Sequence, residues 1–479
     1  MHYAVIFRIL GILLMLFSLT QLIPLAVSLF YKDGEHLAFF TSFLVTFIVG
    51  LIIWVPVFRA RSDLRTRDGF LITSLFWIVL SLFGSLPFLT DAQLALSATD
   101  SIFEAVSGLT TTGATVITGL DELPRSLLYY RQQLQWLGGI GIIVIAVAVL
   151  PMLGIGGMQL YQADTPGPIK DSKLTPRITE TAKWLFFIYL TLTFICALSY
   201  WLAGMTLFDA ICHSFSTISI GGFSTHDANM GYFNSPAIWL TASFFMFISG
   251  INFVLHYFTW RRRQISQYFS DSESRFYFLF LFIAFLIAWY YLAGSSAQSG
   301  AEHSWIHALF QVISLGTTTG FVTTEFGSWP GFLPVLLIFL SFVGGCAGST
   351  SGGIKVIRII LVAKQGLREL KQLIHPNAVM PLKLRRRTVS NTVLSAVWSF
   401  IAIYLSVFLM LCLLLMITGM EFTTAFSATA AMLNNLGHGV DDMNHATDTA
   451  KWIMCLAMLL GRLEIFTLLV LFTPAFWQR

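Results

Sequence analysis

The sequence predicts an all-α polytopic membrane protein of about ten spans, in which four pseudo-repeats of helix, re-entrant pore loop and helix surround one central pore. Three observations support this fold class. Hydrophobic residues make up 56% of the 479 residues and charged residues only 11%, a balance that a soluble domain does not need. Long apolar stretches recur along the whole chain, and four short glycine-containing segments recur at nearly even spacing.

The apolar stretches define the predicted spans in chain order. A helix needs about 20 apolar residues to cross the hydrocarbon core of a bilayer, and shorter apolar pieces can form re-entrant segments. The long stretches lie at 5–30, 38–58, 69–89, 138–152, 184–202, 238–258, 276–292, 393–417 and 452–472.

Lysine and arginine are distributed unevenly between the loops that join these spans. Lys32, Arg125, Arg131 and Lys451 are expected on one side, which also collects most of the acidic residues. The positive-inside rule places the more basic side, with both termini, in the cytoplasm. An acidic outer mouth would concentrate cations. Most of the 28 basic residues fall in the cytoplasmic loops at 59–67, 170–183, 261–275 and 355–387.

Four similar segments carry one glycine each at a shared position: Gly113, Gly222, Gly320 and Gly437. Each follows an amphipathic run that is too short to cross a bilayer but long enough for a re-entrant helix. A chain that dips into the membrane and returns as extended backbone leaves carbonyls unpaired, which lipid forbids unless that backbone lines a watery cavity. Four such loops around one axis would form a cavity of that kind.

The residue types in these segments suit a cation. Glycine permits backbone angles that turn carbonyl oxygens toward an axis, and rings of carbonyls can replace the water shell of an ion. For one segment alone, close helix packing through small residues would be the better interpretation, but four segments in register favour a filter. The predicted filter residues are Thr111, Thr112, Gly113, Ile220, Gly221, Gly222, Thr318, Thr319, Gly320, Asn435, Leu436 and Gly437.

The strings at 109–116, 214–226, 344–353, 433–437 and 461–466 are specific in combination. In them the sequence resembles the membrane subunits of the Trk/Ktr/HKT superfamily of potassium transporters, and the bacterial TrkH type most of all. The resemblance covers nearly the whole chain. It implies two leading transmembrane helices in 1–68, followed by one pore repeat in each of 69–180, 181–272, 273–387 and 388–479.

The resemblance also implies a function. The chain would be a potassium-selective, channel-like subunit of a bacterial Trk uptake system in the inner membrane, with potassium as the transported ion. It would form a homodimer and bind a cytoplasmic nucleotide-binding ring of the TrkA type. The chain itself is not expected to bind a nucleotide, because its glycine-rich strings lack the Lys-Ser/Thr of a phosphate loop, and no nucleic-acid partner is expected. Since each repeat keeps one filter glycine, weaker discrimination between potassium and sodium is expected than in tetrameric potassium channels.

Small residues interrupt the second span of the third repeat, so it should be irregular within the membrane. We expect it to lie across the ion path below the filter as a gate; a close-packed helix crossing is the alternative. Arg462, an isolated charge in the last span, should face the pore as an electrostatic barrier unless it only braces the loop, and Glu464 lies on another helix face. Lys355 is expected at the cytoplasmic interface. The gate residues are Gly344, Gly345, Gly348, Ser349, Thr350, Ser351, Gly352, Gly353 and Arg462.

Two other functions stay open. A symporter that couples potassium to protons or sodium would be expected to show a titratable relay within its spans. A membrane enzyme would need converging His, Asp, Glu or Cys side chains. The spans hold few such residues beyond Arg462, Glu464 and His256, so both alternatives are weaker than a passive pore, and an enzyme is not expected.

Overall fold

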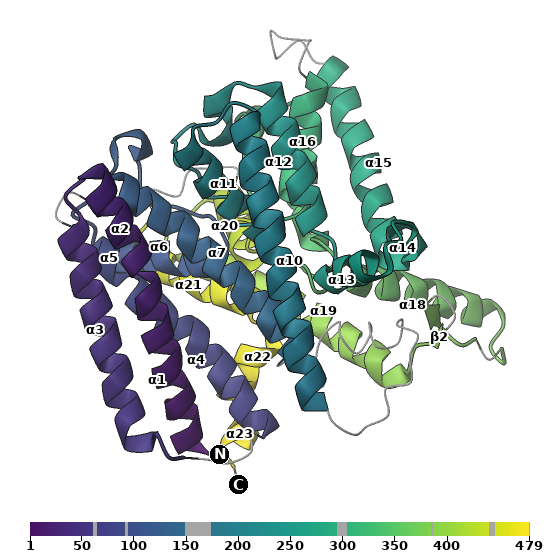
Figure 1. The fold of residues 1–479 in the computed structure, drawn as a ribbon. Helices are drawn as coiled ribbons and strands as arrows, with labels where there is room; N and C mark the ends of the chain where they lie inside the picture. The colour runs from purple at the N-terminus through teal and green to yellow at the C-terminus, as the bar shows by residue number, and fades with distance from the viewer. Residues whose placement is uncertain are drawn as a thin grey trace.

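The protein is a bundle of helices with both termini at the same end (Figure 1). The structure, a computed structural model, describes residues 1–60, 65–91, 94–148, 174–294, 304–378, 380–384, 387–439 and 446–478. In this part of the chain, six helical stretches are long and apolar enough to cross a membrane, and two bent helix pairs qualify if each counts as one span. The predicted all-α polytopic architecture is confirmed.

The leading helices pack as a hairpin at one edge of the bundle (Figure 1). Gly11 and Gly50 let the two antiparallel helices cross closely. A Cβ on Gly11 would lie 2.8 Å from the carbonyl oxygen of Gly50, and one on Gly50 would lie 3.0 Å from that of Gly11. Small residues at such crossings are how membrane helices approach each other. The elements are α1 (Tyr3–Thr20), α2 (Leu22–Tyr31), α3 (His36–Trp54) and the 3₁₀ turn η1 (Val55–Val57).

Four repeats follow, each with a first helix, a short pore helix and a second helix. The first repeat contains α4 (Thr66–Gly84), α5 (Leu86–Thr90), the pore helix α6 (Ala98–Leu109), η2 (Leu120–Glu122) and α7 (Arg125–Ala148). The second contains α10 (Leu174–Leu202), the pore helix α11 (Leu207–Ser219), η3 (Asn229–Phe233), α12 (Pro236–Ser249) and α13 (Phe253–Arg262).

The third and fourth repeats continue the same order. The short helix α14 (Ser266–Ser270) links the second repeat to the third. The third contains α15 (Ser272–Gly294), the pore helix α16 (Ser304–Gly316), η4 (Phe326–Ser328), α17 (Leu333–Val343) and α18 (Val356–Ile374), and an antiparallel pair follows it, β1 (Lys383–Leu384) with β2 (Arg387–Thr388). The fourth contains α19 (Asn391–Ile417), the pore helix α20 (Phe422–Leu433), α21 (Asp448–Arg462), α22 (Phe466–Leu469), η5 (Val470–Phe472) and α23 (Pro474–Trp477).

Side-chain caps fix where the first two pore helices begin. The hydroxyl oxygen of Ser97 accepts a hydrogen bond of 3.1 Å from the N–H of Asp100, and that of Thr206 accepts one of 3.1 Å from the N–H of Asp209. Each hydroxyl in turn donates to the carboxylate of the same aspartate, over 2.9 and 2.7 Å. Because the first N–H groups of a helix lack partners within it, Ser or Thr followed by Asp three residues later starts a helix here.

The second helix is broken in three of the four repeats. α12 and α13 meet at 92°, and α21 and the α22–η5 segment meet at 108°. α17 and α18 are separated by the non-helical residues 344–355, whereas α7 is continuous over 125–148. Non-helical backbone within a membrane protein must be covered by protein or line a watery cavity, so the three breaks mark the central region.

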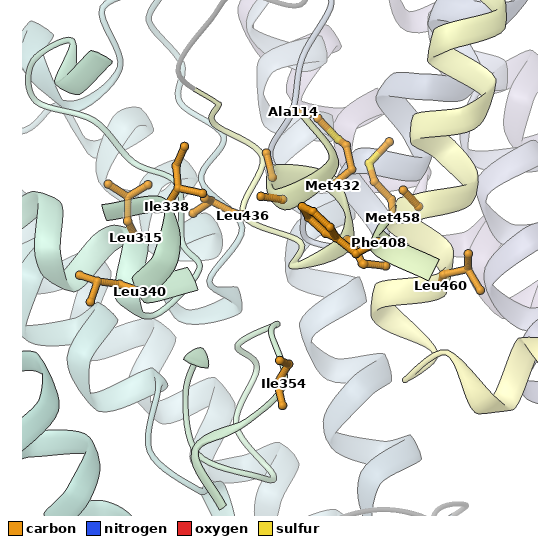
Figure 2. Packing of buried hydrophobic residues seen from close by; sticks show 14 of the residues in the cluster. Ala114, Leu315, Ile338, Leu340, Ile354, Phe408, Met432, Leu436, Met458 and Leu460 are labelled. Carbon is orange, nitrogen blue, oxygen red and sulfur yellow. The ribbon is translucent and has the colours of Figure 1, made fainter. Parts of the chain in front are cut away.

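Buried apolar side chains fill the space between the repeats. Leu315 and Ile338 of the third repeat are 0% and 4% exposed, and Met432 and Met458 of the fourth are both 0% exposed. Figure 2 shows the two methionines on neighbouring elements of the fourth repeat, with Ile354 of the segment after α17 lying apart from them. This packing fixes the pore helices against the long helices that surround them.

Candidate functional site

All four pore helices end in the same backbone conformation. The residue two positions before each shared glycine has a φ between 50° and 66°, and each glycine has a φ between 79° and 87°. This left-handed helix end is a Schellman cap, which normally uses glycine and here uses Thr, Ile or Asn. The hydrogen bonds that define it, 2.7–2.9 Å long, run from the N–H to the carbonyl of Thr112 to Ser107, Gly221 to Ser216, Thr319 to Ser314 and Leu436 to Ala431.

The four loops touch one another in cyclic order. A Cβ on any of the four glycines would lie 2.0 or 2.1 Å from a carbonyl oxygen of the next loop, well inside the 3.0 Å that real Cβ atoms respect. Only glycine therefore fits at these positions. The contacts join Gly113 to the carbonyl of Gly221, Gly222 to that of Thr319, Gly320 to that of Leu436 and Gly437 to that of Thr112. The last contact returns to the first repeat, so the ring is closed.

Four equivalent backbone carbonyls in this ring have no hydrogen-bond donor in the part of the chain that the structure describes. Within the described residues, no hydrogen bond reaches the carbonyl oxygens of Thr111, Ile220, Thr318 and Asn435. All four residues are at most 1% exposed. Buried carbonyls normally have a partner, so a fourfold set without one is the chemistry expected of a site that receives a partly dehydrated cation.

Threonine hydroxyls brace two of the loops from within. Thr110 and Thr112 form a hydroxyl pair of 2.7 Å in the first repeat, and Thr317 and Thr319 form an equivalent pair of 2.7 Å in the third. The hydroxyl of Thr111, in contrast, makes no hydrogen bond within the described residues. The braces hold the backbone of these two loops in one shape.

Gln135 of α7 holds the loop of the second repeat. Its Nε2 donates to the carbonyl of Gly221 over 2.6 Å, and its Oε1 accepts from the N–H of Phe223 over 3.2 Å. One amide thus clamps the backbone on both sides of Gly222. The sequence does not predict this role, because nothing in the string around Gln135 marks it out from other glutamines.

A buried ion pair lies behind the first two loops. Arg131 of α7 donates from Nε to Glu104 of α6 over 2.7 Å, and both side chains are at most 1% exposed. Its other nitrogens donate to the hydroxyl of Thr115 over 3.0 Å and to the carbonyl of Ser224 over 3.1 Å. The loop pattern predicts Arg131 on the outer surface, and that prediction is wrong because Glu104 compensates its charge inside the protein. Glu104, an acidic residue within the first pore helix, was the sequence signal that a basic partner is buried nearby.

Residues 344–353, the gate loop, lie against the ends of three pore helices. The stretch is non-helical, so the irregular conformation is present rather than a close-packed helix. A Cβ on Gly352 would lie 1.9 Å from the carbonyl oxygen of Asn434 in the fourth repeat. Hydrogen bonds join Thr350 Oγ1 to the carbonyl of Ile218 (3.1 Å), Ser351 Oγ to the carbonyl of Thr317 (2.6 Å) and the N–H of Gly352 to Thr318 Oγ1 (2.7 Å).

The rest of the gate loop is held by its own residues and by the break between α12 and α13. Gly344, Gly348 and Gly353 have φ between 67° and 77°, so glycine is required there. The contacts are Gly345 N–H to Ser351 Oγ (2.8 Å), Ser349 Oγ to the carbonyl of Cys346 (2.6 Å), Cys346 N–H to the carbonyl of Gly250 (2.8 Å) and Phe253 N–H to the carbonyl of Gly348 (3.1 Å).

Arg462 reaches the gate loop from the end of α21. Its Nη1 donates to the carbonyl of Thr350 over 3.0 Å, while Nε and Nη2 have no hydrogen-bond partner within the described residues. Glu464 pairs with Arg358 and not with Arg462, as expected, although it lies in the break between α21 and α22 and not on another face of one continuous helix. Lys355 does not extend to the cytoplasmic interface as expected: it turns back and donates to the carbonyl of Ser351.

His226 joins the outer loops of the first two repeats. Its Nδ1 contacts the carboxylate of Asp121, its Nε2 lies 3.6 Å from Asp209 Oδ1, and its ring stacks on Tyr232 with centroids 3.5 Å apart. Burial opposes protonation of the ring, but the nearby carboxylates of Asp209 and Asp121 outweigh it and raise the pKa of His226 above its ordinary value.

Two other residues, Lys451 and His438, lie on this side of the protein, and the loop pattern predicts Lys451 in a loop here. Lys451 is not in a loop but in α21, where it is 8% exposed and pairs with Asp100 at the start of the first pore helix. His438, next to Gly437, is exposed, and its ring lies 6.0 Å from that of Phe326. Asp441 and Asp442 lie outside the described residues.

The chain is similar to known transport proteins along its length. Residues 35–479 match the family TrkH, described as a cation transport protein. The chain is 54% identical to the Trk system potassium uptake protein TrkH of Halomonas elongata and 51% identical to that of Escherichia coli K12, with 100% of both chains covered in each case. The crystal structure of the potassium transporter TrkH from Vibrio parahaemolyticus covers 100% of both chains, with a TM-score of 0.93 and 51% identity.

Proposed function

This chain belongs to the TrkH family of cation transport proteins, and we propose that it is the potassium-selective, channel-like membrane subunit of a Trk uptake system. It is a transport protein and not an enzyme, like the relatives that it matches. Those relatives are named as potassium uptake proteins, which supports potassium as the cargo. The observation that carries the proposal is the closed ring of four loops with four unpartnered carbonyls.

The ring is the proposed filter. A potassium ion that enters it would exchange water for carbonyl oxygens, supplied by the three residues of each repeat that end at Gly113, Gly222, Gly320 and Gly437. None of the twelve predicted filter residues is charged, so the ion would be held by dipoles that can also release it. Each pore helix ends within a few residues of its filter glycine, and the partial negative charge of a helix C-terminus favours a cation there.

The gate loop and Arg462 are the proposed barrier below the filter. The loop contacts the ends of the pore helices of the second, third and fourth repeats, which would obstruct the path of an ion that leaves the ring. The guanidinium of Arg462 adds a positive charge at the same level, and a cation that passes it is repelled strongly where water is scarce. Movement of the loop and of Arg462 together would open the path.

The proposed partners rest on the resemblance and on one surface. We expect a homodimer, and a cytoplasmic nucleotide-binding ring of the TrkA type that controls the gate. α18 supports a cytoplasmic docking surface, because Lys364, Arg368 and Lys371 lie on its outer part, where Leu370 and Leu373 are 61% and 79% exposed. The resemblance implies the bacterial inner membrane, and the basic loops favour an orientation with both termini in the cytoplasm.

Buried carboxylates favour a second candidate, a potassium/proton symporter. Glu273 and Glu464 lie within or beside membrane spans, and such groups often belong to proton relays. Glu464, however, is engaged by Arg358, and Glu273 accepts backbone hydrogen bonds. Fixed contacts of this kind suit structural roles, so the passive pore remains the better-supported function.

The reversal potential of the purified protein in a planar bilayer tests the proposal. A potassium gradient opposed by a sodium gradient should give a reversal near the potassium equilibrium potential and independent of pH. A reversal that follows the proton gradient, or flux without current, would replace the channel by the symporter. An E273Q/E464Q variant serves as the matched control, because a symporter that uses these carboxylates would lose its proton dependence in it.

A further inference from the structure

We propose that Glu273 is a positioning residue that ties the gate loop to the first turn of α18, so that displacement of α18 moves the gate. The proposal rests on the function of residues 344–353 as a gate and adds the link through which the cytoplasmic side would act on it. Glu273 is the second residue of α15, and no sequence motif marks it. It is 6% exposed.

One carboxylate oxygen of Glu273 serves both elements. Its Oε1 accepts from the N–H of Ala347 in the gate loop over 2.7 Å and from the N–H of Ile357 in α18 over 3.2 Å. Within the described residues no lysine, arginine or histidine lies within 4.0 Å of this carboxylate. A buried carboxyl group without an ion-pair partner depends on its hydrogen bonds, so these two N–H groups are what holds the side chain of Glu273 in place.

The position of Ile357 makes this contact sensitive to the placement of α18. The first N–H groups of a helix have no partner within the helix and carry the positive end of its dipole. The N–H of Val356 donates instead to the carbonyl of Gly345 over 3.1 Å, and the N–H of Ile357 donates to Glu273. The first turn of α18 is therefore bonded to the gate loop once directly and once through Glu273.

Glu273 belongs to α15, which is separate from both the gate loop and α18. Asp271 Oδ2 accepts from the N–H of Ser274 over 2.9 Å and so caps the start of α15. Because Asp271 caps α15, the carboxylate of Glu273 is available to accept hydrogen bonds from the gate loop and α18. A shift of α18 relative to α15 must break one of the two bonds to Oε1 or draw Ala347 along.

α18 is a long helix with one buried end and one exposed end. Val356 and Leu361 in its first part are 0% exposed, whereas Leu367 and Leu373 further along are 60% and 79% exposed. The helix has 19 residues, which at 1.5 Å each makes it about 28 Å long. A protein that binds the exposed part can tilt the helix, and the buried end carries that tilt to Glu273.

Single-channel recording without any cytoplasmic partner tests the proposal. Glu273→Ala should raise the open probability about tenfold, the order of magnitude expected from the loss of its hydrogen bonds to Ala347 and Ile357, and should leave the potassium-to-sodium reversal unchanged. Glu273→Gln, which keeps an acceptor oxygen, should have a smaller effect. Asp271→Asn is the matched control, since it perturbs the same end of α15 without touching the gate loop, and it should behave as wild type.

A double-mutant cycle tests whether Glu273 couples the position of α18 to the gate loop or only stabilises the gate loop. Arg358→Ala breaks the pair with Glu464 and should shift α18, which raises the open probability when Glu273 is present. In the Glu273→Ala background, the same change should have little further effect, because the link is already cut. Fully additive effects would overturn the proposal.

Hydrogen exchange provides a readout that does not depend on current. Glu273→Ala should speed exchange in the 344–358 peptide and leave the filter peptide 108–115 unchanged, whereas equal acceleration in both would mean general unfolding and overturn the proposal. Arg462→Ala is recorded in parallel. If Arg462→Ala raises the open probability and Glu273→Ala does not, the proposed role of Glu273 is wrong but the gate assignment stands. If neither variant changes the open probability, both the role of Glu273 and the gate assignment are wrong.

Discussion

Asn435 of the fourth repeat donates a hydrogen bond of 3.0 Å from Nδ2 to the hydroxyl oxygen of Thr112 in the first repeat. The same amide nitrogen donates to the carbonyl of Met458 in α21 over 2.9 Å. One side chain thus joins the loop of the fourth repeat to the loop of the first. We call this junction the seam of the ring. Gly437 and Thr112 make the backbone contact beside it.

Asn435→Ala should weaken this seam and lower the potassium-to-sodium permeability ratio. The loss of one hydrogen bond, about 1 kcal/mol, corresponds to a change of roughly fivefold. Bi-ionic reversal potentials measure the ratio. Since Asn435 has a φ of 53°, Asn435→Gly serves as the control that removes the amide without backbone strain. An unchanged ratio in both variants would mean that the seam does not contribute to selectivity.

Gly113→Ser should abolish selective potassium current, because its Cβ would lie 2.1 Å from the carbonyl oxygen of Gly221. Gly119→Ser is a matched control. Gly119 has a similar φ of 74°, but nothing lies within 4 Å of its Cβ position. The control carries the same kind of backbone strain without the clash, so it should conduct with normal selectivity. Equal effects of the two substitutions in planar bilayers would contradict the closed ring.

Arg131→Met should destabilise the protein by about 3–5 kcal/mol, because it leaves the charge of Glu104 buried and unpaired. Thermal unfolding in detergent, followed by tryptophan fluorescence, measures the loss. The double variant Glu104→Met with Arg131→Met removes both charges and should recover most of the stability. A double variant less stable than Arg131→Met would contradict this, because the hydrogen bonds that Glu104 accepts from Thr115 and Val116 would then outweigh the cost of its unpaired charge.

Raising the pH should loosen the outer loops of the first two repeats. The pKa of His226 is raised in the folded protein, so its stabilising effect is complete below the ordinary value of about 6.5 and is lost as the pH rises through the raised value. The facing groups are Asp121, Asp209, His213 and Tyr232, and the two acids among them favour the protonated ring. The unfolding midpoint should therefore fall between about pH 6 and pH 9 more in wild type than in His226→Gln. Parallel pH curves for the two proteins would exclude His226 as the cause.

Arg462→Ala should raise the leak of potassium through the protein in the absence of a cytoplasmic partner. The substitution removes both a positive charge at the barrier and the hydrogen bond to the carbonyl of Thr350. Arg462→Lys keeps the charge and should leak less than the alanine variant. Efflux of potassium from proteoliposomes measures the leak, and an unchanged or lower rate in Arg462→Ala would contradict the barrier role.

The fold was predictable because its signals are local. Apolar length predicts spans, and the four glycines could be aligned from sequence, since each sits at the one position where no Cβ fits. The positive φ of Ile220 and Asn435 was not predictable, because those residue types rarely adopt it. Their conformation is imposed by the cap that ends each pore helix and by the neighbouring loops.

The supporting contacts of the site were harder to predict than the site itself. Gln135, Arg131 and Glu104 act on loops that lie far away in the sequence, and no local pattern tells which polar residue reaches which loop. Lys355 was expected at the interface from its position after an apolar stretch, but its ammonium group donates to the carbonyl of Ser351 in the gate loop. Partners of this kind depend on tertiary structure.

The ring of four loops belongs to one polypeptide, and this has a genetic consequence. In a channel assembled from four identical chains, any substitution appears at every quarter of the ring at once. Here each quarter is encoded separately, so Thr111, Ile220, Thr318 and Asn435 occupy the same place with three different chemistries. Selection can therefore adjust one side of the ring while the other three are unchanged, and tolerance to substitution should differ from quarter to quarter.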